Sequence, residues 1–200
     1  MRLTTALAVI AGSILMAGCG PVLSIHPLYT QANLVSDLPL EGNWAEQDNR
    51  QLWQVHKSGD GYEVIAADTS GAASVQKFDV HLLRLNEFHF LDIAPQSPPD
   101  LAISGHLFAR IWMEGPDLRV ALIDSDWMAQ MMEAGIAPQG VTGPRQQIIL
   151  TAGTSELQKF VSLYALEPKA FNADPGDLHP VQEPIPLLPP RRPSQPSPRR

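Results

Sequence analysis

Short stretches rich in apolar, β-branched and aromatic residues recur between residues 41 and 151, and polar turn residues such as glycine, proline, asparagine or aspartate bound most of them. Such stretches are typical of β-strands. This pattern predicts strands over residues 41–46, 51–57, 62–67, 75–85, 88–93, 106–114, 118–123 and 147–151. Connections such as Asn86-Glu87 suit antiparallel hairpins and are too short for parallel crossovers. The pattern therefore predicts a mainly β protein, an antiparallel meander or barrel-like curved sheet of about eight strands.

Two stretches have the helical spacing of apolar residues instead. One follows a candidate N-cap, Asp124 or Ser125, and carries Trp127, Met128, Met131 and Met132. The other begins near Thr154, and its apolar stripe is Leu157, Phe160, Val161 and Tyr164. We expect two amphipathic helices packed on the sheet, the methionines of the first filling core space rather than lining a binding groove. We also expect burial of the strand aromatics Trp44, Trp53, Phe90 and Trp112.

The N-terminus resembles a secretory signal. Arg2 precedes an apolar run over residues 6–17, which is about half the ~20 residues that a membrane-spanning helix needs. Leu15, Met16, Ala17 and Gly18 then precede Cys19 and resemble the bacterial lipobox. The resemblance implies cleavage of residues 1–18 and acylation of Cys19, which becomes the mature N-terminus. An aspartate directly after the acylated cysteine would resemble an inner-membrane retention signal, but this chain has Gly20 there. We therefore expect an outer-membrane protein facing the periplasm if the source is Gram-negative.

Composition divides the rest of the chain. We expect residues 19–40 to be a lipid anchor and extended leader, and residues 41–171 to be the β domain with its two helices. Nine of the 19 prolines lie within residues 172–200, which also carry four arginines. This composition predicts a disordered tail, a spacer whose arginines contact a protein or cell-wall partner.

Charge and motifs exclude several classes of function. Residues 20–171 contain nine basic and eighteen acidic residues, a net charge of −9, so nucleic acid is not an expected partner. With Cys19 used for lipid, no GxSxG elbow and no phosphate-binding loop, nothing indicates an enzyme or a cofactor. Asp124-Ser125-Asp126 lacks the further ligands of a calcium loop and is better explained by helix capping.

Four histidines, His56, His81, His89 and His106, lie on predicted strands and raise the question of a metal site. If Asn86-Glu87 is a two-residue turn, His81 and His89 lie on opposite faces of that hairpin and cannot share an ion. The same register places His81 opposite Asp92. We expect no metal site, and a cross-strand pair of His81 and Asp92 is the remaining alternative to solvated surface histidines.

Two resemblances bear on function. The phrase SIHPLYT at residues 24–30 and LTAGTSELQKF at residues 150–160 resemble small β-rich lipoproteins of uncharacterised function. Gly42-Asn43-Trp44 resembles the opening of lipocalins, whose tryptophan packs across the base of an eight-stranded barrel. The sequence therefore predicts a membrane-tethered envelope lipoprotein that acts as a structural or interaction module. The alternative is a lipocalin-like carrier of a small apolar ligand.

Overall fold

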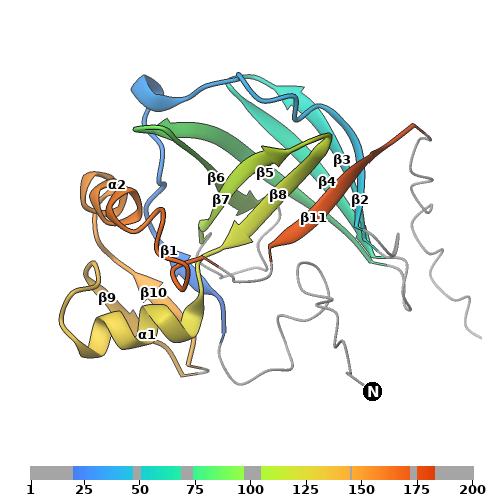
Figure 1. Ribbon diagram of the computed structural model, residues 1–200. Coiled ribbons are helices and arrows are strands. Elements are labelled where there is room, and N and C mark those ends of the chain that lie inside the picture. Colours follow the sequence, from blue (N-terminus) through green and yellow to red (C-terminus); the bar gives the residue numbers. More distant parts are fainter. Residues whose placement is uncertain are drawn as a thin grey trace, which may run out of the picture.

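The computed structural model describes residues 20–46, 51–68, 74–96, 105–144, 146–171 and 175–182. Eight antiparallel strands form a closed barrel (Figure 1), which confirms the predicted fold class. In chain order its strands are β2 (Gly42–Glu46), β3 (Gln51–Ser58), β4 (Gly61–Asp68), β5 (Ser74–Leu85), β6 (Phe88–Pro95), β7 (Leu107–Glu114), β8 (Asp117–Leu122) and β11 (Gly176–Val181). Seven of them coincide with predicted strands.

Hairpin register follows the turn chemistry. Asn86 and Glu87 connect β5 to β6 and pair Leu85 with Phe88, as expected, and Asn86 has a positive φ of 54°. The even-numbered residues of β5, such as Val80 and Leu82, face the barrel interior with Leu91 and Ile93 of β6. The odd-numbered residues of β5 therefore lie on the outer wall, because successive side chains of a strand point to opposite faces.

The eighth barrel strand corrects the predicted tail. β11 lies within residues 172–200, where the proline content had indicated disorder, and it pairs with both β2 and β8 to close the barrel. At Pro180 the strand pairs with β2 alone, since its pairing with β8 ends at Leu178. A proline is tolerated at a strand position that pairs on one side only. The high proline content of residues 172–200 therefore predicted disorder although a six-residue strand lies within them. The predicted domain boundary at residue 171 is therefore wrong, and residues 183–200 lie outside the described residues.

A second layer covers part of the outer wall. Its strands are β1 (Val22–Ser24), β10 (Ile148–Leu150) and β9 (Gly140–Thr142), in the order β1-β10-β9, with β1 parallel to β10. Its helices are α1 (Ser125–Glu133), α2 (Thr154–Leu163) and the 3-10 turn η1 (Gln31–Asn33). The strand predicted over residues 147–151 is thus real but belongs to this layer. The leader is likewise part of the fold, because β1 is built from it.

Local caps explain where the helices begin. The Asp124 carboxylate accepts a hydrogen bond from the Trp127 backbone N–H at 2.7 Å, which confirms the predicted N-cap of α1. The N-cap of α2 is Gly153 rather than Thr154. The Thr154 hydroxyl instead donates to the Pro27 carbonyl oxygen at 2.7 Å and ties the helix to the leader.

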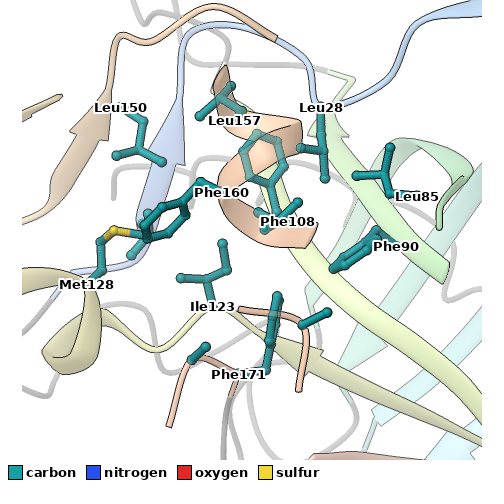
Figure 2. Packing of buried hydrophobic residues seen from close by; sticks show 14 of the residues in the cluster. Leu28, Leu85, Phe90, Phe108, Ile123, Met128, Leu150, Leu157, Phe160 and Phe171 are labelled. Carbon is teal, nitrogen blue, oxygen red and sulfur yellow. The ribbon is translucent and has the colours of Figure 1, made fainter. Parts of the chain in front are cut away.

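The two layers create two hydrophobic cores. The barrel core fills the interior and contains Trp44 and Trp53. The outer core lies between the barrel wall and the helices, where Phe90 and Phe108 of the wall meet Met128, Leu157 and Phe160 (Figure 2). Burial of Trp44, Trp53 and Phe90 is confirmed, whereas Trp112 is only half-buried, at the margin of the outer core beside Arg110.

Candidate functional site

The barrel interior is nearly filled by side chains. It retains a cavity of about 70 Å³. Apolar side chains such as Trp44, Trp53, Phe78 and Leu118 dominate its wall. Pockets that hold small molecules have volumes of roughly 300 to 1,000 Å³. The barrel cavity is therefore far smaller than the binding site of a typical carrier.

A larger and more polar pocket lies where the leader meets the barrel wall. It has a volume of about 320 Å³. We call it the outer pocket, and its lining residues are Tyr29, Ser58, Asp60, Gly61, Tyr62, Asp79, His81, Asp92, Ala94 and His106. Tyr29 comes from the leader, whereas the other residues come from β4, β5, β6 and the segments that flank them. The fold therefore assembles this pocket from five separate parts of the chain.

Asp92 forms the floor of the outer pocket. Its side chain is 1% exposed, and its two oxygens accept separate hydrogen bonds, one from the Leu28 backbone N–H at 2.6 Å and one from His106 Nδ1 at 2.6 Å. The pair holds the His106 ring through its Nδ1 atom. Asp92 thus fixes both the leader and the orientation of an imidazole.

The rim of the pocket is built around His81. Its ring stacks on Tyr29 with a centroid distance of 4.0 Å, and its Nε2 lies 3.4 Å from the Asp60 carboxylate. Asp60 also accepts a hydrogen bond from Gln31 Nε2 at 2.6 Å. Gly61 permits this approach, since a Cβ there would lie 2.6 Å from the Val80 carbonyl oxygen and 3.0 Å from His81 Cδ2.

The carboxylates give the pocket a negative potential. Burial raises the pKa of the Tyr29 hydroxyl, and the charges of Asp92, Asp60 and Asp79 raise it further. The hydrogen bond from Gln31 lowers the pKa of Asp60, and the neighbouring His81 lowers it further. An ionised carboxylate at the rim and hydrogen-bond acceptors on the wall favour a ligand that donates hydrogen bonds.

The histidine predictions are partly confirmed. His81 and His89 do lie on opposite faces, since Arg84 pairs with His89 while His81 pairs with Asp92. His81 and Asp92 are register partners, but the Asp92 carboxylate bonds His106 and Leu28 instead. The pairing of Asp92 with His106 and the stacking of Tyr29 on His81 were not predicted from the sequence. The signal for Asp92 was its position as the one acid in the run FHFLDIAP, which indicates a buried carboxylate with a partner.

Cys19, the predicted lipid-attachment residue, lies outside the described residues, as does the predicted signal peptide. Within the described ranges, no group of three or more histidine, cysteine, aspartate or glutamate side chains is arranged to hold a metal ion. Neither helix in that part of the chain has the length and apolar character needed to cross a bilayer.

Comparison with known proteins gives no relative. No family model matches the chain, and neither a curated protein nor a solved structure matches it at a significant level.

Proposed function

We propose that the protein is a membrane-tethered envelope lipoprotein, acylated at Cys19, that acts as an interaction module without enzymatic activity. The observation that carries the module proposal is the contrast between the two cavities. The barrel interior leaves about 70 Å³, whereas the outer pocket leaves about 320 Å³. A protein with a filled interior makes its contacts through its outer surface, and the outer pocket is a hollow on that surface whose lining gathers three aspartates and two histidines.

The chemistry of the outer pocket favours a donor-rich cationic group on the partner. Asp60 and Asp79 are exposed carboxylates, which accept hydrogen bonds and donate none when ionised. An ammonium group carries three donors and no acceptor, so it matches this arrangement. We propose a primary ammonium group of an envelope component or partner protein as the ligand.

Matched cations test this proposal on the full chain in detergent micelles. Propylammonium should shift the backbone amide signals of Tyr29, Asp60 and His81 in NMR titrations, and Asp60→Asn should weaken the binding. Tetramethylammonium has the same charge but no N–H donor, so it is the control and should shift these signals much less. Equal shifts with both cations, or shifts confined to other surfaces, would contradict a hydrogen-bonding ammonium site.

The lipid anchor has an independent test. Changing Cys19→Ser should move the protein from the membrane fraction to the soluble fraction, because two or more acyl chains are needed for stable anchoring and each buried methylene contributes about 0.8 kcal/mol. Mass spectrometry should find acyl chains on the wild-type protein and none on the Cys19→Ser variant. A membrane-bound Cys19→Ser protein, or a wild-type protein without acyl mass, would show that this anchoring is wrong.

Residues 183–200 supply the second proposed contact. They carry all four arginines of the proline-rich C-terminal region, in two pairs at residues 191–192 and 199–200, while the domain is acidic. We propose that these arginines contact an anionic polymer of the cell wall or an acidic protein partner.

The lipocalin-like carrier remains the second candidate because the barrel cavity is apolar and the Trp53 Nε1 atom has no hydrogen-bond partner in the described part of the chain. The volume of this cavity argues against it, since an apolar cavity of about 150 Å³ holds a molecule as small as benzene. We therefore expect no saturable fluorescence increase when N-phenylnaphthylamine is titrated into the protein. A saturable increase that is lost in Val64→Trp, which would fill the cavity, would restore the carrier.

A further inference from the structure

We infer that the outer face of the β1-β10-β9 sheet is the surface that rests on the bilayer to which Cys19 is attached. This inference rests on the proposed acylation of Cys19 and adds an orientation to it. The face is defined by Leu23, Ile149 and Val141, which form one row across the three strands.

Side-chain alternation separates the two faces of this sheet. Val22 and Ser24 of β1 and Ile148 and Leu150 of β10 are buried against the outer core. Leu23 and Ile149 point to the opposite face and are half-buried, and Val141 beside them is 53% exposed. Gly105 lies against Leu23 and accounts for part of its burial. The outward row is therefore apolar and, at Val141, open.

The attachment point lies next to this sheet. Cys19 is bonded to Gly20, and only Gly20 and Pro21 separate it from β1. Gly20 is held against Gln147 at the connection between β9 and β10, where a Cβ on Gly20 would lie 2.8 Å from the Gln147 Cβ. Two residues span at most about 7 Å, so acyl chains on Cys19 would hold the sheet close to the lipid headgroups.

Charge supports the same orientation. The chain has 21 acidic residues, yet none lies within residues 20–36 or 134–155, which contain all three strands. The one basic residue in these two segments is Arg145. Three exposed large hydrophobic residues, Ile25, Ile136 and Val141, come from the same two segments. An anionic bilayer surface repels carboxylates and accepts apolar side chains, so the apolar row on strands that carry no acid of their own is suited to it. The Glu156 carboxylate of α2 approaches this layer at the Gln139 N–H, which precedes β9.

Depth-dependent quenching tests the orientation in the acylated full chain. Val141→Cys is compared with the matched control Val75→Cys, since Val75 is 43% exposed on β5 of the barrel. Each introduced thiol is labelled with a bimane fluorophore, and the protein is reconstituted into phosphatidylethanolamine and phosphatidylglycerol vesicles with brominated acyl chains. We expect at least twofold stronger quenching at position 141 than at position 75.

Hydrogen exchange supplies a test without any substitution in the sheet. On vesicles, amides within residues 136–150 should exchange several-fold more slowly than in the soluble Cys19→Ser protein, whereas β4 and β5 should exchange equally in both. Two results in a protein that carries acyl mass would overturn the orientation and leave the anchoring intact. One is equal quenching at positions 141 and 75, and the other is unchanged exchange over residues 136–150. A wild-type protein without acyl mass would overturn the proposed anchoring, and the orientation with it.

Discussion

The Asp92 carboxylate joins the leader to the barrel wall at the floor of the outer pocket. This carboxylate is 1% exposed and accepts from the Leu28 N–H and from His106, which lie 64 and 14 residues away in sequence. These two hydrogen bonds replace the hydrogen bonds to water that the carboxylate loses when it is buried on folding. The same bonds hold Tyr29, the next residue after Leu28, at the rim of the pocket.

Replacing Asp92→Ala should lower the free energy of unfolding by about 3 kcal/mol, because the buried Leu28 N–H and the half-buried His106 ring lose their partner. Urea denaturation of the soluble Cys19→Ser protein would measure the change. Glu87→Ala, in the exposed hairpin turn between β5 and β6, is the control and should stay within about 0.5 kcal/mol of the parent. A loss at Asp92 no larger than at Glu87 would mean that this carboxylate does not anchor the leader.

Asp60 makes the stability of the pocket rim dependent on pH. Its pKa is lowered in the folded protein, mainly by the hydrogen bond from Gln31, so folding is favoured by the ionised form. The stabilisation is therefore present above the unfolded pKa of about 3.9 and is lost as the pH falls through the lower folded pKa. Asp60→Asn should be less stable than the parent at pH 7, and the difference should shrink at pH 3. Urea unfolding at the two pH values checks this, and a difference that grows at pH 3 would contradict it.

Among the elements, β11 determines whether the barrel is closed. Its pairing with β2 and β8 removes two sheet edges, and Leu178 of this strand is buried in the barrel core. A chain that ends after residue 182 should melt within a few degrees of the full chain. A chain that ends after residue 174 should melt more than about 10 °C lower or lose its cooperative transition, because two edges and the core are opened. If the two truncations melt alike, β11 does not stabilise the barrel.

The elements that the sequence predicted are those with an unambiguous local signal. Stretches of β-type residues between turn residues identified β2 to β8, and helical spacing of apolar residues identified α1 and α2. β11 was missed because Pro180 and its proline-rich surroundings outweighed the short apolar pattern at Leu178 and Val181. The sequence also could not show which sheet β10 joins, because its parallel partner β1 lies more than a hundred residues away. The outer pocket depends on the same long-range contacts.

At the scale of the whole molecule, most of the outer layer lies in sequence between two strands of the barrel, β8 and β11. The chain leaves the barrel after β8, builds α1, β9, β10 and α2, and returns as β11, so the barrel strand that closes last in sequence follows the outer layer (Figure 1). Phe90 and Phe108 of the barrel wall belong to the outer core, and the Arg110 guanidinium donates to the Ala165 carbonyl oxygen at 2.8 Å. The two cores therefore share one wall.

This connectivity predicts that both cores unfold in one transition. Leu157→Ala in the outer core and Leu82→Ala in the barrel core remove side chains that are 1% and 0% exposed, and each should cost about 2 to 5 kcal/mol. Leu163→Ala is the matched control, since Leu163 is 75% exposed on α2 and its truncation should change little. In each variant, hydrogen exchange at increasing urea should release the amides of α2 and of β4 at the same midpoint, because β11 cannot stay paired once the segment that leads to it has lost its core. Release of α2 at a clearly lower urea concentration in Leu157→Ala, with β4 still protected, would show instead that the barrel is stable on its own and that the outer layer is a separate folding unit.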